Sequence, residues 1–138
     1  MTAHLLTITA PLDRDGKPDW LRANGGHGNR YAKAATIKTW RQTAAWEARR
    51  QHLPRITGPV HITATVHLDT KSRHWDAGNW APTAKACIDG LQLHPKLGGA
   101  DVLRGDCNCW VIGPDMRAGE PWADAALVLR IEPLEVAA

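Results

Sequence analysis

The sequence predicts a single α+β domain in which two main helices pack on a mixed β-sheet of about four strands. The chain has 138 residues, which is the size of one domain with its own core. Several stretches alternate apolar and polar residues, as half-buried strands do, and two stretches between them have helical spacing and composition. The resulting order, strand, long loop, helix, strand, helix, strand, strand, favours helices packed on one sheet over residues 1–138.

The first half of the chain is expected to hold a strand, a loop, a helix and a second strand. Residues 4–9 form a short strand that ends before Pro11, and residues 13–30 contain the glycine-rich turns DRDGK and NGGHGNR. Residues 33–52 are rich in helix formers and contain neither glycine nor proline. Their apolar stripe, expected to face the core, is Ile37, Trp40, Ala44 and Ala48. Residues 60–68 alternate most clearly of all.

The second half is expected to begin with a helix and to end with two strands. Pro82 suits the first turn of a helix that runs to about Leu91. Residues 106–113 alternate and predict a strand, and residues 125–132 predict another with Leu127, Leu129 and Ile131 on its buried side. The segment GPDMR, residues 113–117, is interpreted as the turn between these two strands.

Composition excludes a disordered chain and a membrane-spanning one. Hydrophobic residues make up 43% of the chain and charged residues 22%, which is ordinary for a globular protein. No apolar run approaches the ~20 residues that cross a bilayer. The first residues, MTAHLLTITAPLDRD, lack the basic and long apolar regions of a signal peptide. We therefore expect a soluble, cytoplasmic protein with no membrane partner.

The net charge of +3 is unevenly distributed along the chain. Residues 1–75 carry 12 Lys+Arg against 5 Asp+Glu, whereas residues 76–138 carry 5 against 9. A basic half joined to an acidic half favours a nucleic-acid partner together with a carboxylate cluster for a cation. The alternative is a chance scatter of solvated charges. The chain also has seven Trp, one Tyr and no Phe, and these Trp side chains either stack on bases or replace Phe in the core.

The three cysteines are expected to be reduced thiols. Their number is odd and no secretion signal precedes them, which argues against a disulfide framework. The pair Cys107 and Cys109 allows a second interpretation, a zinc or partner-binding site. No second pair of ligands with zinc-site spacing accompanies them.

Three aspartates and one lysine are candidates for a metal-dependent hydrolytic site. Lys85 and Asp89 are four residues apart and share one face of the predicted helix. Asp76 follows the clearest strand, and Asp106 begins the next predicted strand, so the four side chains can converge. Carboxylates are the ligands that Mg²⁺ prefers, and Mg²⁺ beside a basic surface is suited to phosphodiester hydrolysis. Alternatively, Lys85 and Asp89 form an ordinary surface pair and the other two are turn residues.

Two segments, RHWDAGNWAPTAKACIDGL and VLRGDCNCWVIGPDMR, resemble the RusA family of phage and prophage Holliday junction endonucleases. That family has an Asp-x-Asp-Asn segment, then a helix with Lys and Asp four residues apart, then an acidic pair before a strand. The matching positions here are Asp76, Asn79, Lys85, Asp89 and Asp106. Residues 73–116 carry the specific part of the resemblance, and residues 5–52 fit the family outline more loosely.

The resemblance implies a homodimeric endonuclease of DNA recombination and repair that resolves four-way or other branched junctions by paired nicks. It implies Mg²⁺ as cofactor, with Mn²⁺ as a substitute, held by Asp76, Asp89 and Asp106. Lys85 would act at the phosphate, so these four residues form the expected catalytic set. The expected DNA-binding residues are Arg14, Lys17, Arg22, Asn24, Arg30, Lys33, Lys71, Arg73 and Asn79.

The chain departs from the family pattern at two acidic positions. Gly78 stands where the family usually has its second aspartate, and Gly105 replaces the first acid of the later pair. Three extra residues lie between Asn79 and Lys85 relative to the shorter family pattern. The metal site is then either reduced to three aspartates or completed by another carboxylate such as Asp101. The alternative function is a catalytically inactive junction- or DNA-binding protein of the same fold.

Overall fold

The computed structural model describes residues 2–23, 30–72, 74–92, 99–105 and 107–134. It confirms the α+β class, with a four-stranded mixed sheet and two main helices. The elements, in chain order, are β1 (His4–Thr9), α1 (Arg30–Arg50), β2 (Val60–His67), the 3₁₀ helix η1 (Ala77–Trp80), α2 (Ala81–Gly90), β3 (Val111–Ala118) and β4 (Ala126–Pro133).

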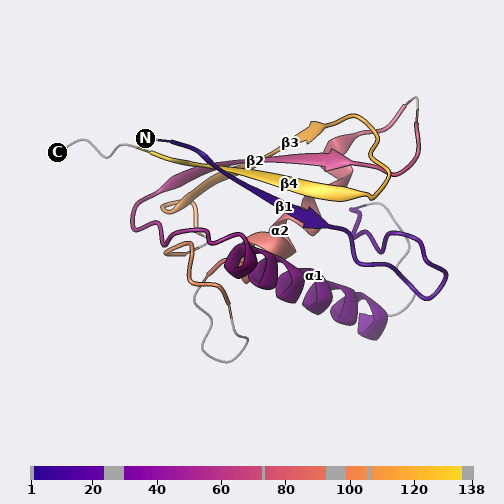
Figure 1. Cartoon of the computed structure of the whole chain (residues 1–138), viewed down its shortest axis with the longest axis horizontal. Helices are drawn as coiled ribbons and strands as arrows, with labels where there is room; N and C mark the ends of the chain where they lie inside the picture. Colours follow the sequence, from indigo (N-terminus) through magenta and orange to yellow (C-terminus); the bar gives the residue numbers. More distant parts are fainter. Residues whose placement is uncertain (1, 24–29, 73, 93–98, 106, 135–138) are drawn as a thin grey trace.

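The strands follow the order β1-β4-β2-β3 across the sheet. β4 lies antiparallel to both β1 and β2, whereas β2 and β3 are parallel. Parallel neighbours need a crossover connection, and η1 with α2 provides it. Both helices lie on one side of the sheet, which gives the domain two layers (Figure 1).

The core lies between the helices and the apolar face of the sheet. Strand β2 alternates as expected, with Val60, Ile62, Ala64 and Val66 all at most 1% exposed. Helix α1 contributes the predicted stripe, in which Ile37 is partly buried and Trp40, Ala44 and Ala48 are buried. Leu127, Leu129 and Ile131 of β4 are fully buried, again as expected. Period-2 strands and a period-3.6 helix therefore bury one continuous core.

The two helices cross at a glycine. A Cβ atom at Gly90 of α2 would lie 2.2 Å from the backbone carbonyl oxygen of Arg41 in α1. No real Cβ contact is that short, so the absence of a side chain at position 90 allows the two backbones to meet. This contact fixes the end of α2 against the middle of α1.

The strand expected over residues 106–113 is right only for residues 111–113, because β3 begins at Val111. Cys107 and Cys109 are joined in a disulfide, which corrects the expectation that all three cysteines are reduced. The amides of Trp110 and Val111 both donate to the carbonyl of Cys107, at 2.9 Å each. Residues 107–110 therefore form a turn, and the alternation of Cys107, Cys109 and Val111 does not reflect a strand.

The interpretation of residues 113–117 as a turn is also wrong, since these residues lie inside β3. Asp115, Met116 and Arg117 pair with β2 in parallel register. Gly113 has a φ of 106°, and a Cβ there would lie 2.5 Å from the carbonyl oxygen of Ile62, so glycine is needed at this irregularity. Because β3 is an edge strand, the sheet also tolerates the missing amide of Pro114.

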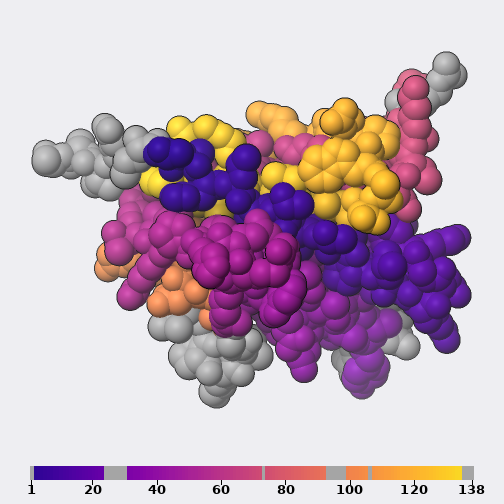
Figure 2. Space-filling model, viewed as in Figure 1, coloured from indigo at the N-terminus to yellow at the C-terminus, as the bar shows by residue number. Residues whose placement is uncertain are grey.

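Two connections gather at one end of the molecule. The segment 10–23, the beginning of α1 and the loop that follows β2 all lie at the right-hand end in Figures 1 and 2. α1 itself begins at Arg30, three residues earlier than expected. Among the described residues, no helix combines the length and apolarity needed to span a membrane.

Candidate functional site

Asp76 caps the 3₁₀ helix that leads into α2. Its backbone is extended, with φ −110° and ψ 113°, and its Oδ1 atom accepts a hydrogen bond of 2.9 Å from the amide of Gly78. The side chain is otherwise exposed, so the carboxylate keeps acceptor capacity toward solvent. A Cβ atom at Gly78 would lie 3.2 Å from Asp76 Oδ1. The bend therefore turns position 78 toward the carboxylate of residue 76.

Asp76 lines a hollow of about 490 Å³. The amide of Ala23 donates to the carbonyl of Asn79 at 2.8 Å, which brings the basic segment 20–23 to the edge of this hollow. Arg22 thereby borders the same hollow as Asp76. The lining residues are Arg22, Ala23, His74, Trp75, Asp76, Gly78, Asn79 and Trp80.

A buried hydroxyl holds the segment before Ala23 on α2. Thr83 Oγ1 accepts from the amide of Leu21 at 2.9 Å and donates to the carbonyl of Leu21 at 2.7 Å. Both residues are fully buried, so this pair satisfies groups that water cannot reach. The segment up to Ala23 thus has a fixed position beside the helix that carries Lys85 and Asp89.

Four of the seven tryptophans form a row that ends beside Asp76. Trp20 stacks on Trp40 with ring centroids 5.3 Å apart, and the edge-on pair Trp20–Trp80 is 6.4 Å apart. Trp80 meets Trp75 edge-on at 5.3 Å. Trp40 and Trp80 are buried, and Trp75 is half-buried. The guanidinium carbon of Arg22 lies 5.9 Å from the Trp80 ring centroid, within cation–π range.

Lys85 and Asp89 border a second, smaller cavity of about 110 Å³. Both side chains therefore lie on the same face of α2, as the i, i+4 spacing predicts. Asn108 and Val111 border the same cavity, so this face of α2 meets the turn 107–110 and the start of β3. The Gln92 amide nitrogen lies 3.4 Å from Asp89 Oδ1, at the end of hydrogen-bond range.

Neither kind of cysteine in the structure is an available metal ligand. Burial, and secondarily the charge of Asp89, raises the pKa of the Cys87 thiol far above its usual range. The thiol therefore stays protonated at neutral pH, whereas metals bind thiolates. Cys107 and Cys109 are bonded to each other, so neither offers a thiolate in this state.

Two of the three expected metal ligands, Asp76 and Asp89, border different cavities. No group of three His, Cys, Asp or Glu side chains in the described part of the chain is placed to hold a metal. Asp106 lies outside the described residues. Asp101, the alternative carboxylate, instead faces Arg55 at 3.7 Å.

The expected DNA-binding cations are exposed wherever the structure describes them. Asn79 is half-buried beside Asp76. Asn24, Arg73 and the side chain of Arg30 lie outside the described part of the chain. The exposed cations are Arg14, Lys17, Arg22, Lys33 and Lys71.

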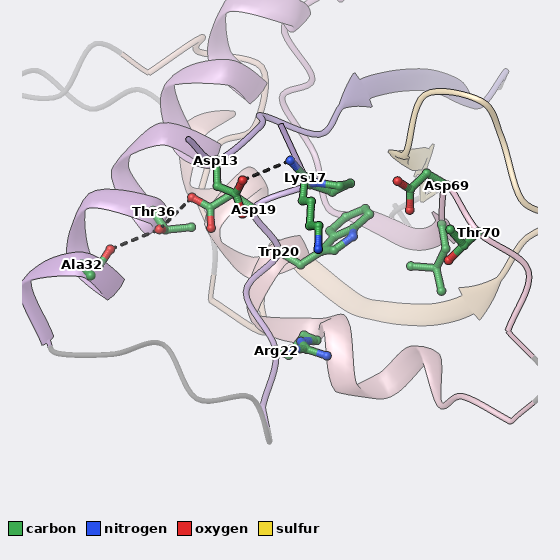
Figure 3. A pocket seen from close by; sticks show the side chains of 11 residues that line it. Asp13, Lys17, Asp19, Trp20, Arg22, Ala32, Thr36, Asp69 and Thr70 are labelled. Carbon is green, nitrogen blue, oxygen red and sulfur yellow. Dashed lines mark hydrogen bonds between the residues drawn. The ribbon is translucent and has the colours of Figure 1, made fainter. Parts of the chain in front are cut away.

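A cavity of about 770 Å³ lies between the segment 13–22, the first turns of α1 and the end of β2. Figure 3 shows Lys17 and Trp20 between Asp19 and Thr36 on one side and Asp69 and Thr70 on the other. Sequence reasoning named Lys17 and Arg22 here but missed Trp20 and Asp69. The surplus of tryptophan was a signal for Trp20, whereas no local pattern marks Asp69. A scan of protein-family models and a search of curated proteins find no match to this chain.

Proposed function

We propose that this chain is a RusA-like, structure-specific endonuclease that nicks four-way or other branched DNA junctions as a symmetric dimer. The observation that carries the proposal is the hollow at the start of α2, where an exposed carboxylate, Asp76, and a guanidinium, Arg22, border the same space. A phosphodiester needs a cation to bind its charge and a carboxylate to hold a metal ion or a water. Both groups stand there on segments fixed by backbone hydrogen bonds.

Asp76 and Asp106 would be the principal ligands of Mg²⁺. Mg²⁺ is commonly held by one or two carboxylates, with waters and substrate phosphate completing its shell, so a protein site needs few side chains. When bound, the ion would polarise the scissile phosphate and lower the barrier to attack by water. Asp89 would be the third ligand, as the resemblance implies. Its cavity is shared with Asn108, which follows Asp106 by two residues.

The chain's own residues would bind and position the DNA. Lys85 is exposed on α2, where its ammonium would offset charge on the phosphate. Arg22, beside the Trp80 ring, would contact the backbone next to Asp76. The exposed cations Lys17 and Lys71 would extend this contact along the strand. Because such contacts release counterions, affinity should fall steeply with salt.

Two-fold symmetry would match the symmetry of a four-way junction and set one site on each of two opposed strands. Trp46 is the residue we assign to the dimer contact. It projects from α1 with 60% of its surface exposed, and the Arg50 guanidinium carbon lies 5.5 Å from its ring centroid. Trp and Arg are enriched at protein interfaces.

The alternative function is a junction-binding protein without hydrolysis. Gly78 supports this alternative. Position 78 faces the Asp76 carboxylate, and glycine supplies no second carboxylate there. With one ligand fewer, the metal would bind more weakly or not at all. The DNA-binding surface would be unaffected.

Cleavage of a synthetic four-way junction in Mg²⁺ or Mn²⁺ separates the two functions. Asp76→Asn keeps an oxygen that accepts from the Gly78 amide, so it tests charge and not the cap. We expect it to lower nicking by at least ~100-fold while binding in EDTA is retained. Asp124→Asn, an exposed aspartate between β3 and β4, is the matched control and should nick like the wild type. If the wild type binds the junction but does not nick it in either metal, the proposed endonuclease is contradicted and the junction-binding function remains.

A further inference from the structure

We propose that the 770 Å³ cavity beside Trp20 is a pocket for one unpaired nucleotide of the DNA substrate. The inference rests on the proposed DNA function and adds a second recognition element to it. The pocket would accept a base that is extruded from the duplex at a branch point or bulge. Four features of the cavity lead to this assignment.

The first feature is an aromatic surface held in a fixed position. Trp20 stacks on Trp40 at an interplanar angle of 17°, and the Trp40 indole nitrogen donates to the carbonyl of Asp19 at 2.7 Å. Trp80 meets Trp20 edge-on from another side. The part of Trp20 that these rings leave uncovered borders the cavity. An aromatic side chain held in this way is a stacking platform for a base.

The second feature is positive charge at the same cavity. Lys17 and Arg22 are both exposed and both border it. In Figure 3 the two side chains lie near Trp20, on the segment between β1 and α1. Cations beside an aromatic platform are the arrangement that binds a nucleotide, because the phosphate and the base are held by different groups.

The third feature is a carboxylate on the opposite wall. Asp13 Oδ1 accepts from the amides of Asp15 and Lys17, and Asp19 Oδ2 accepts from the Thr36 hydroxyl at 3.1 Å, so both acids have local roles. Asp69 has no hydrogen bond or ion pair to any residue that the structure describes. A carboxylate only accepts hydrogen bonds. It would therefore favour bases with an exocyclic amino group, and disfavour thymine.

The fourth feature is the position of the cavity next to the candidate catalytic hollow. Arg22 borders both spaces, and the Trp20–Trp80 contact joins their walls. A nucleotide in the pocket would therefore leave the neighbouring phosphate close to Asp76. The pocket would favour branched or bulged DNA over an uninterrupted duplex, which stacks all of its bases internally.

Fluorescence of 2-aminopurine tests the pocket without metal or catalysis. One probe is a duplex with a single bulged 2-aminopurine nucleotide, and the other is the same duplex with that base paired. In EDTA, the full-length protein should quench the bulged probe and bind it more tightly than the paired one. Trp20→Leu should lower affinity for the bulged probe about 5- to 150-fold, the effect of losing one stacked base, and leave the paired probe unchanged. Trp122→Leu, at a tryptophan that stacks on His67 and borders neither cavity, should keep the full preference.

A second pair of probes covers the case in which Trp20→Leu does not fold. The wild type should bind a bulged cytosine more tightly than a bulged thymine, and Asp69→Asn should bring the two affinities together, since an amide both donates and accepts. Equal binding of bulged and paired probes by the wild type overturns the pocket, as does an unchanged preference in Trp20→Leu or Asp69→Asn. If the protein nicks junctions but binds bulged and paired probes equally, only the pocket proposal is overturned. If it prefers the bulged probe but never nicks a junction, the endonuclease proposal is overturned and the pocket proposal stands.

Discussion

Gly78 faces the carboxylate of Asp76: a Cβ atom built at position 78 would lie 3.2 Å from Asp76 Oδ1. The distance is slightly shorter than an ordinary van der Waals contact, and a small rotation of the Asp76 side chain would relieve it. Any acid at position 78 would therefore stand beside Asp76. The bend at the start of η1 is thus suited to a pair of carboxylates, of which this chain has one.

Gly78→Asp should strengthen metal binding if the chain is the proposed endonuclease. Two adjacent carboxylates form a better Mg²⁺ site than one, and we expect half-maximal nicking of a four-way junction at a roughly tenfold lower Mg²⁺ concentration. In EDTA the like charges repel, so the melting temperature should fall, and Mg²⁺ should restore it. Nicking is measured across a Mg²⁺ series and melting with and without the ion.

Gly78→Asn is the control for this change, because it adds a side chain of the same size without the charge. It should neither shift the Mg²⁺ dependence nor make the melting temperature respond to Mg²⁺. Equal behaviour of the two variants would contradict a metal site at Asp76.

Thr83→Val should destabilise the fold and loosen the segment that carries Arg22. Valine has the shape of threonine without its hydroxyl, so the buried amide and carbonyl of Leu21 would both lose their partner. Each unsatisfied buried group costs about 1–3 kcal/mol, and we expect the free energy of unfolding to fall by about 2 kcal/mol or more. Urea unfolding measures this loss. Thr83→Ser keeps the hydroxyl, so a loss as large as that of the valine variant would show that the two hydrogen bonds are not its cause.

Glu47 should make stability depend on pH in the acid range. The carboxylate accepts hydrogen bonds from Arg50 at 2.7 Å and from Gln51 at 2.7 Å, and Gln51 also donates to the carbonyl of Thr7. The hydrogen bond to Arg50, foremost, holds the pKa of Glu47 below its usual 4.5, although burial opposes it. A depressed pKa in the folded state means stability that is present above about pH 4.5 and lost as the pH falls below it.

Glu47→Gln should therefore lose less stability than the wild type between pH 5 and pH 3, although it starts lower at pH 7. Urea unfolding at each pH gives both curves. Parallel curves would mean that Glu47 contributes nothing to acid sensitivity. Glu120→Gln, on an exposed loop residue, should follow the wild type.

The sequence predicted those elements whose apolar pattern is long and regular. β1, β2, β4 and α1 each bury one face, and the period of that face can be read along the chain. β3 could not be found in this way, because Gly113 and Pro114 are normally turn residues. They fit a strand here only because β3 is at the sheet edge and its backbone approaches Ile62. Both conditions arise from the tertiary structure, so no pattern in the local sequence indicates them.

The candidate site shows the same division between local and distant relationships. The common face of Lys85 and Asp89 follows from helical spacing alone, and the structure has it. Whether Asp76 meets Asp89 depends on how η1 and α2 lie, and the two residues border different cavities. The row of tryptophans required contacts between residues up to 60 positions apart, such as Trp20 and Trp80. Composition indicated an excess of tryptophan but no arrangement.

The three cysteines should react with iodoacetamide in a fixed order. The native oxidised protein should take up no adduct, since Cys107 and Cys109 are bonded to each other and Cys87 is buried. Reduction of the folded protein should expose two reactive thiols, because Cys107 and Cys109 lie on the surface. Unfolding should add the third.

Mass spectrometry of the alkylated protein across a pH series also tests the environment of Cys87. Burial raises the pKa of its thiol, so no adduct should form there in the folded protein at pH 9, where an exposed thiol is half ionised. The raised pKa also means that the unfolded state loses its proton first. The contribution of the protonated Cys87 thiol to stability is therefore complete below about pH 9 and is lost as the pH rises further. An adduct on Cys87 in the folded protein, or zinc bound stoichiometrically, would contradict this assignment of the cysteines.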